Sequence, residues 1–205
     1  NLIAGNEHGI KISGESASNN VILNNLIGAD ISGKSGLGNR GSGVLVEGAP
    51  ANRIGATSTR WRNVISGNSG DGVLIRSTGA NGNTVSNNYI GLDIEGRVTI
   101  GNSGSGVVIL DAPNNFIGST STETLNLISG NLKHGIHISG TSAKSNKVEG
   151  NRIGTDVDAL TPIANAGSGI AITGAPENRI GGAPESRNLI SGNGSHGIEI
   201  TGKSA

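Results

Sequence analysis

Asn63-Val64-Ile65-Ser66-Gly67-Asn68 is the stretch that decides the fold, because it recurs along the chain. Close copies begin at Asn126 and Asn188, and a variant with Ala in place of Ser begins at Asn1. The starts at 1, 63, 126 and 188 are 62, 63 and 62 residues apart. A fixed period of this length is typical of a solenoid, in which each unit buries its apolar face by stacking on its neighbours. The sequence therefore predicts a single domain, residues 1–205, of tandem repeats.

A second motif divides each long repeat into two unequal turns. It is a glycine followed by an apolar, a variable and an apolar residue, with steps of 34, 29, 34, 29, 34 and 28 residues. Alternation with period two, rich in Ile and Val, indicates a half-buried strand. The glycines that open these strands are Gly9, Gly43, Gly72, Gly106, Gly135, Gly169 and Gly197.

Two further short strands in each turn begin with asparagine. One series has a β-branched residue two places on, and the other reads Asn-x-Ile. Strands of one pattern at this spacing must pair in parallel, and crossovers between parallel strands are right-handed. No window has a helical stripe of apolar residues. The sequence thus predicts an all-β fold, a right-handed parallel β-helix with three short strands per turn and six to seven turns. The second asparagine series is Asn1, Asn25, Asn63, Asn88, Asn126, Asn151 and Asn188.

The first asparagine series predicts a ladder of side-chain amides. Asparagine at one place in every turn can hydrogen-bond up and down the stack, and it tolerates left-handed backbone at a corner. The alternative, that these residues bind a ligand, is weaker because stacked β architecture produces polar ladders anyway. The predicted ladder consists of Asn20, Asn52, Asn83, Asn115, Asn146 and Asn178.

The rhythm of Gly-Ile-x-Ile, Asn-x-Val and Gly-Asn-x-Ile-Gly resembles the right-handed parallel β-helix repeat family. This pectin lyase-like superfamily includes polysaccharide lyases, hydrolases and epimerases, phage tailspikes and bacterial surface proteins. The resemblance covers the whole chain and implies the fold and an extracellular or cell-surface protein. It says little about activity, because one fold serves many functions. In the enzymes, the resemblance implies clustered Asp or Glu, often with Ca²⁺, an Arg or Lys base, or a His.

Composition narrows the classes of function. Lys and Arg number 15 and Asp and Glu number 15, so no excess of positive charge favours nucleic acid. No apolar run is long enough to insert into a membrane. The absence of cysteine excludes disulfides and thiol catalysis. The chain starts and stops inside a turn without a terminal cap, which fits either a fragment of a longer array or a subunit whose ends stack on other subunits.

Three aspartates are the only candidates for a metal site. Asp30, Asp93 and Asp156 each open one of the longer turns. Ca²⁺ needs six to eight oxygen ligands, whereas residues two turns apart are separated by roughly 9.6 Å and cannot share an ion. The alternative, an Asx-turn that opens the loop, is favoured. We therefore expect no cofactor, with Ca²⁺ as the weaker possibility.

No catalytic group can be assigned from spacing. His8, His134 and His196 precede strand-opening glycines, with Asp71 in the equivalent place, and they recur two or more turns apart. An acid, a base and a substrate must lie within hydrogen-bond reach of one another. The acidic and basic signatures of the enzymes that the chain resembles are also missing. We expect no catalytic residues.

Weak candidates for partner binding come from exposed aromatic and apolar positions. Trp61 lies between two arginines, although it can equally cover nearby apolar surface. The middle residues of two strand series should point outward. Such rows suggest a partner or lateral assembly, unless the longer loops fold over them. These outward candidates are Leu26, Leu45, Leu74, Tyr89 and Leu127.

Together these patterns predict a non-catalytic structural or adhesive rod of an extracellular, cell-surface or filament protein. Its expected partners are copies of itself or another surface protein or glycan, with no nucleic acid and no membrane insertion. The alternative is a fragment of a carbohydrate-active lyase, hydrolase or epimerase.

Overall fold

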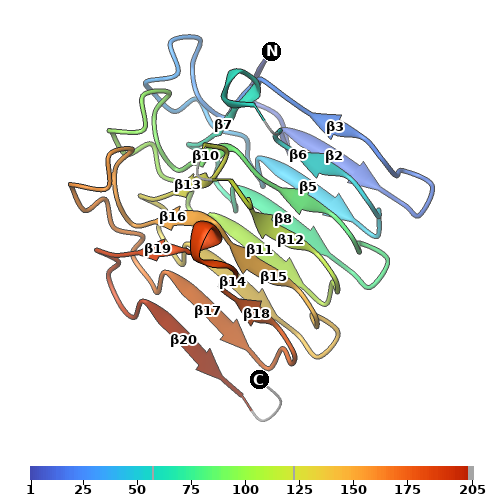
Figure 1. The fold of residues 1–205 in the computed structure, drawn as a ribbon. Coiled ribbons are helices and arrows are strands. Elements are labelled where there is room, and N and C mark those ends of the chain that lie inside the picture. The colour runs from blue at the N-terminus through green and yellow to red at the C-terminus, as the bar shows by residue number, and fades with distance from the viewer. Residues whose placement is uncertain (57, 122, 203–205) are drawn as a thin grey trace.

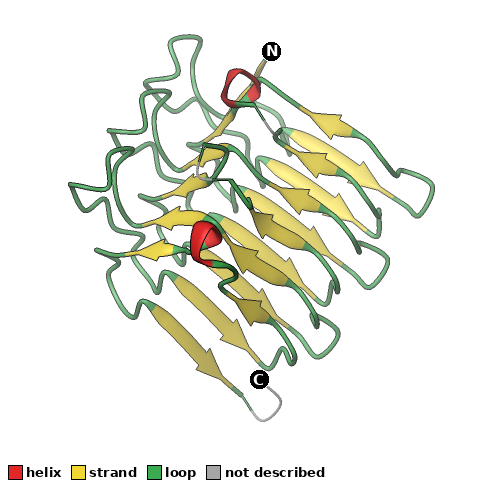
Figure 2. Cartoon of the chain, in the orientation of Figure 1, coloured by secondary structure: helices red, strands yellow, loops and turns green. Residues whose placement is uncertain are grey.

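The protein is a parallel β-solenoid of about six turns, with one strand from every turn in each of three sheets (Figure 1). The computed structural model describes residues 1–56, 58–121 and 123–202. Figure 2 shows strands along the body of the coil and two short helical turns at its side. In the described part of the chain no helix is both long and apolar enough to cross a membrane. The predicted all-β solenoid with three strands per turn is confirmed.

The three sheets take their strands in chain order. Sheet A contains β1 (Leu2–Ile3), β4 (Leu26–Ile27), β7 (Asn63–Ile65), β10 (Asn88–Ile90), β13 (Asn126–Ile128), β16 (Asn151–Ile153) and β19 (Leu189–Ile190). Sheet B contains β2 (Ile10–Ser13), β5 (Val44–Glu47), β8 (Val73–Arg76), β11 (Val107–Leu110), β14 (Ile136–Ser139), β17 (Ile170–Thr173) and β20 (Ile198–Thr201). Sheet C contains β3 (Val21–Ile22), β6 (Arg53–Ile54), β9 (Thr84–Val85), β12 (Phe116–Gly118), β15 (Lys147–Glu149) and β18 (Arg179–Ile180). The 3₁₀ turns are η1 (Thr59–Trp61) and η2 (Pro184–Ser186).

The core is a stack of Ile and Val columns, one from each sheet. In sheet B every inward residue pairs in parallel register with its counterpart in the next turn, and the five inner members are fully buried. The predicted column is therefore confirmed. It contains Ile10, Val44, Val73, Val107, Ile136, Ile170 and Ile198.

The glycine before each sheet B strand is required by close packing at a corner of the coil. A Cβ added to Gly43 would lie 2.5 Å from Ile65 Cγ2 and 2.8 Å from the carbonyl oxygen of Gly72. Real Cβ contacts are not this short, so only glycine lets the isoleucine column of sheet A approach the corner. This explains why the glycine recurs in every turn.

The asparagine ladders form as expected. The side chain of Asn83 donates to Asn115 Oδ1 over 3.1 Å, and the backbone N–H of Asn115 donates to Asn146 Oδ1 over 2.8 Å. The series that opens the sheet A strands is joined by an unbroken chain of amide–amide hydrogen bonds from Asn1 to Asn188. Inner members of both ladders are buried, so their polar groups depend on one another instead of on water.

A third ladder, which the sequence reading missed, lies at the turn before sheet B. Its side-chain amides are linked from the first turn to the last. A sequence signal does exist, because from the second turn onward the asparagine stands four residues before the strand-opening glycine. The third ladder consists of Asn6, Asn39, Asn68, Asn102, Asn131, Asn165 and Asn193.

Every second turn carries a projecting side loop after its sheet A strand, which Figure 1 shows on the left. The side loops are residues 28–38, 91–101 and 154–164. Each is folded on itself by an antiparallel bridge, Ala29 with Gly36 in the first. A two-stranded loop is about 9–10 Å wide, the height of two turns, so successive side loops meet directly. The N–H of Ile94 donates to Gly33 O over 2.9 Å, and that of Val157 donates to Gly96 O over 3.0 Å.

Side-loop stacking leads to a prediction for Gly96, which has a φ of 69°. An added Cβ would lie 2.9 Å from Leu127 Cδ2 and 3.0 Å from Tyr89 Cε2. Gly96→Ala is expected to lower the free energy of unfolding by about 1–3 kcal/mol, through left-handed strain and the displaced loop. Ala159 occupies the equivalent place in the third side loop at a φ of 62°. Glycine adopts this left-handed conformation without strain, so Ala159→Gly should raise the free energy of unfolding. Urea denaturation of both variants checks this, and a stable Gly96→Ala protein would contradict it.

Candidate binding site on the outer face of sheet A

The outer face of sheet A carries one continuous row of side chains between the side loops and the segments that lead into β7 and β13. Its members are in register from one strand to the next. The row is mostly apolar and runs along the whole solenoid. It consists of Leu2, Leu26, Val64, Tyr89, Leu127, Arg152 and Leu189.

The middle of this row is covered, which corrects the expectation that Tyr89 and Leu127 face a partner. Their exposed fractions are 5% and 0%. They form a second small core with Leu92, and Val157 and Ile163 of the next side loop pack against it. The loops cover them because stacking draws each side loop onto the sheet. The alternative reading, in which the longer loops fold over the row, holds at these two positions.

The outward candidates on sheet B are also less exposed than expected. Leu45 is 2% exposed, with Lys11 and Leu74 as its neighbours in register on the same face. Leu74 itself is half-buried. Neighbouring long side chains cover Leu45, because parallel register sets them side by side. Leu45 is therefore not available as a contact residue in this fold.

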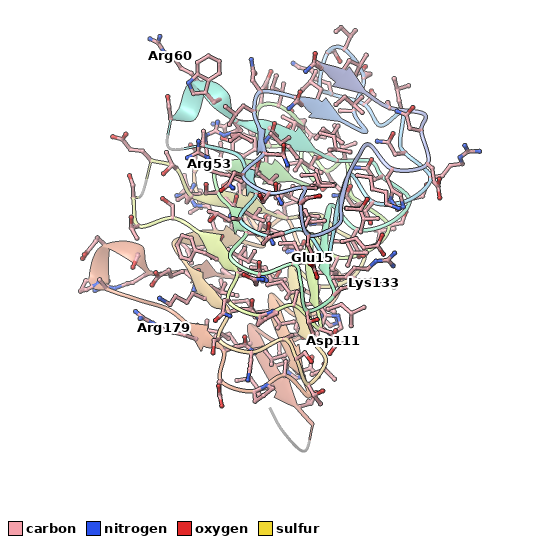
Figure 3. All side chains as sticks on the ribbon, turned by 90° about the vertical axis from the view of Figure 1, so that its right-hand side faces the viewer. Glu15, Arg53, Arg60, Asp111, Lys133 and Arg179 are labelled. Carbon is pink, nitrogen blue, oxygen red and sulfur yellow. The ribbon has the colours of Figure 1, made fainter. Side chains whose placement is uncertain are left out.

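A cavity of about 490 Å³ lies at the N-terminal end of the row, although Val64 in its lining is only 3% exposed. Leu26 and Val64 belong to the row, and Ile31 and Ile94 come from the first two side loops. Arg60 and Arg62 flank the exposed Trp61 around η1 and also line the cavity. Figure 3 shows Arg60 reaching away from the body of the protein. Of the expected contact residues, Leu26 and the Arg60-Trp61-Arg62 segment thus meet at one place. The remaining lining residues are Asn1, Leu2, Asn24 and Asn25.

The second repeat fills the same space with its own side chains. Tyr89 stands where Leu26 stands one repeat earlier, and the guanidinium of Arg62 lies 4.0 Å from the centre of its ring. That distance is typical of a cation–π contact. Glu123 and Leu125 take the places of Arg60 and Arg62, and the cavity that they help to line is only about 200 Å³. Two arginines, Arg62 and Arg152, line this smaller cavity as well.

Arg62 retains unused hydrogen-bonding capacity. Its Nε is buried and has no hydrogen-bond partner, and among the described residues neither Arg62 nor Arg60 forms an ion pair. Among the residues that the structure describes, no carboxylate lines the 490 Å³ cavity. Besides Arg60 and Arg62, the described lining of this cavity consists of five aliphatic residues and three asparagines.

The aspartates considered for Ca²⁺ brace their own loops. Asp30 Oδ1 accepts from the Ser32 hydroxyl at 2.7 Å and from the N–H groups of Lys34 and Ser35. These donors, Ser32 first, lower the pKa of Asp30 below its ordinary value. Asp93 and Asp156 accept in the same way, each from the N–H four residues on. The aspartates thus hold the backbone of their own loops, as the structural reading expected, but through N–H groups four and five residues on instead of the two-residue spacing of an Asx-turn. In the described parts of the chain no group of three or more His, Asp or Glu side chains is arranged to hold a metal ion.

The histidines before the sheet B strands serve the backbone of the next turn. His8 Nδ1 accepts from the N–H of Ser42 at 3.0 Å, and His134 Nδ1 accepts from that of Ser168 at 3.1 Å. Asp71 does the same with its carboxylate in the intervening repeat. An acceptor side chain recurs every second turn because each one accepts from a backbone N–H of the following turn, which accounts for these three positions by structure alone.

A small titratable cluster lies at the C-terminal end of sheet B. The rings of His134 and His137 are 5.2 Å apart, and Glu199 Oε2 accepts from the Ser168 hydroxyl at 2.7 Å. That hydrogen bond, with the nearby histidines, lowers the pKa of Glu199. Burial lowers the pKa of His137, with further lowering from His134 and Lys133, while Glu199 acts in the opposite sense. From the sequence, His134 and His196 are expected to lie too far apart to converge, and Glu199 is not considered; the coil brings both histidines, with His137, close enough to Glu199 to lower its pKa.

The depressed pKa of His137 predicts a loss of stability in weak acid. Because its folded pKa lies below the unfolded value of about 6.5, the unfolded chain binds more protons as the pH falls. The His137 contribution is complete above about pH 6.5 and is lost as the pH falls toward the folded pKa. His137→Val, which copies its neighbour Val108, should reduce the drop in melting temperature between about pH 7.5 and about pH 5.5. An unchanged drop would show that His137 is not responsible.

No protein-family model and no curated protein matches this sequence.

Proposed function

We propose that this chain is a non-catalytic structural or adhesive rod of an extracellular, cell-surface or filament protein. The observation that carries the proposal is the continuity of its side-chain ladders. Three asparagine ladders and a column of side loops tie every turn to the next. Such a scaffold is stiff and holds its loops at fixed intervals of two turns, as a spacer or an adhesive surface requires.

The titratable side chains add support, since many of them already serve the fold. Asp30, Asp93 and Asp156 hold side-loop backbone, and His8 and His134 hold backbone at the turn before sheet B. A general acid or base must exchange a proton with the substrate, whereas the acceptor atoms of these side chains are bonded to the protein's own backbone. The rod's partners are copies of itself or another surface protein or glycan, with no role for nucleic acid or membrane insertion.

The alternative is a carbohydrate-active lyase, hydrolase or epimerase. It is favoured by one observation, the 490 Å³ cavity with Arg60 and Arg62 on the outer face of a parallel sheet. Against it stands the scarcity of aromatic platforms for sugar rings, because the chain has one Trp, one Tyr and one Phe, and Tyr89 is buried.

The test combines assembly with activity. Light scattering across a range of protein concentrations, together with electron microscopy, should show elongated particles that associate. A panel of neutral and acidic polysaccharides, with and without Ca²⁺, should show no cleavage and no epimerisation. A compact monomer that depolymerises or epimerises any member of the panel would overturn the proposal.

A further inference from the structure

We infer that Asn81 is a site of spontaneous covalent modification, at which the side-chain amide is lost and the link to Gly82 rearranges through a succinimide. The inference goes beyond the proposed rod and does not depend on it. Asparagine followed by glycine is the pair that reacts most readily, because no side chain hinders the glycine nitrogen. The chain has two such pairs, Asn81-Gly82 and Asn193-Gly194, and the fold treats them differently.

The reaction needs only water and the two residues. Hydroxide takes the proton from the backbone nitrogen of Gly82, and this nitrogen attacks Cγ of Asn81. The new bond closes the succinimide ring while the amide C–N bond breaks, and the amide nitrogen leaves as ammonia after taking a proton from water. A further water molecule opens the ring at either carbonyl. The products are aspartate and isoaspartate, so a carboxylate replaces a neutral amide with no oxidation or reduction.

Both reacting groups of the first pair are accessible. Asn81 and Gly82 are exposed in the turn between β8 and β9. Among the described residues the N–H of Gly82 has no hydrogen-bond partner, and Asn81 Nδ2 donates to the carbonyl of Gly79 over 3.2 Å. Water readily replaces a bond of this kind at an exposed position. The Asn81 carbonyl accepts from the N–H of Ala51 over 2.9 Å, a bond that the extra main-chain methylene of isoaspartate would disturb.

The second pair is held by a ladder on both sides of the reaction. Asn193 Oδ1 accepts from Asn165 Nδ2 at 2.9 Å. Asn193 Nδ2 donates to the carbonyls of Ile153 and Ser191. The N–H of Gly194, the group that would attack, donates to the carbonyl of Asn165 over 2.8 Å. To react, this pair must give up bonds that join its turn to the preceding one, so the ladder protects Asn193.

The same protection recurs in each of the three ladders. The N–H that follows a ladder asparagine donates to the carbonyl of the ladder asparagine one turn earlier. Examples, one from each ladder, are Phe116 to Asn83 at 2.8 Å, Val64 to Asn25 at 2.9 Å and Ser103 to Asn68 at 2.8 Å. The attacking nitrogen is therefore engaged wherever the ladder bonds form, and Asn81 lies outside all three ladders.

The chain supplies a matched variant for the attacking residue. Gly82 stands directly before a ladder asparagine with a φ of 67°, and Ala51 stands at the equivalent place one turn earlier with a φ of 57°. A Cβ added to Gly82 would have its nearest neighbour, the backbone nitrogen of Ala51, at 4.0 Å. Gly82→Ala should therefore fold, while its methyl group hinders the attacking nitrogen.

The experiment ages the folded protein in mildly alkaline buffer, where hydroxide is more abundant, beside a second sample that is unfolded in urea. Peptide mapping by mass spectrometry detects the exchange of NH₂ for OH at each asparagine, and an isoaspartyl methyltransferase assay detects isoaspartate. We expect the folded protein to react at Asn81 and to keep Asn193 intact, whereas the unfolded chain reacts at both. Gly82→Ala, checked for folding by circular dichroism, should react at residue 81 about tenfold or more slowly.

Three results would overturn the inference. Equal reaction of Asn81 and Asn193 in the folded protein would mean that the ladder gives no protection. An intact Asn81 in the folded protein, after the unfolded chain has reacted, would mean that the turn itself prevents the attack. An unchanged rate in Gly82→Ala would mean that the nitrogen of Gly82 is not the attacking group. If Gly82→Ala fails to fold, the comparison of folded and unfolded protein still decides the matter.

Discussion

Val107→Asp is expected to unfold the centre of the solenoid. Val107 is fully buried and stands in register between Val73 and Ile136, so a carboxylate there has only apolar neighbours in its column. An unpaired charge in such a place costs several kcal/mol, and we expect a loss of about 4 kcal/mol or more in the free energy of unfolding. Urea denaturation followed by far-ultraviolet circular dichroism measures the loss.

The matched control is Val108→Asp, one residue along the same strand. Val108 points to the outer face and is half-buried, so its carboxylate can reach water. We expect a much smaller loss, about 1 kcal/mol. Similar losses in the two variants would mean that the inward and outward faces of sheet B are not distinct, contrary to the column of buried residues.

Asn115→Ala should have the second largest effect. The Asn115 side chain accepts from both the backbone and the side chain of Asn83, and it donates to the carbonyl of Pro113 at 3.0 Å. Alanine would leave these groups unpaired at a position that is 1% exposed. Because each unpaired buried group costs about 1–3 kcal/mol, we expect a total loss of about 2–4 kcal/mol, visible as a lower thermal midpoint.

The ladder offers its own control in Asn20, its exposed first member. Asn20 donates to Asn52, and among the described residues no donor to its side-chain oxygen is found. Asn20→Ala should therefore cost about 1 kcal/mol or less. If Asn115→Ala melts like the unmodified protein, water can replace the ladder bonds and the ladder does not stabilise the fold.

The sequence by itself determined the architecture. Strict alternation around Gly72-Val73-Leu74-Ile75 and its copies fixes an apolar face, and a period of two turns leaves parallel stacking as the way to bury it. The asparagine series followed from the same repetition, since identical polar residues at one place must meet in the stack. These are local patterns repeated at a fixed period, which is why they can be read without coordinates.

The tertiary structure alone decided what the outer surface is. The sequence left open whether Tyr89 and Leu127 face solvent, because burial there depends on a side loop two turns away along the stack. It predicted a gap of roughly 9.6 Å between Asp30 and Asp93, and did not show that each loop is folded back on itself by an antiparallel bridge, so that its two arms span this height. The contact between Arg62 and the ring of Tyr89 likewise required the structure, because these residues are far apart in the sequence and meet only when successive turns stack.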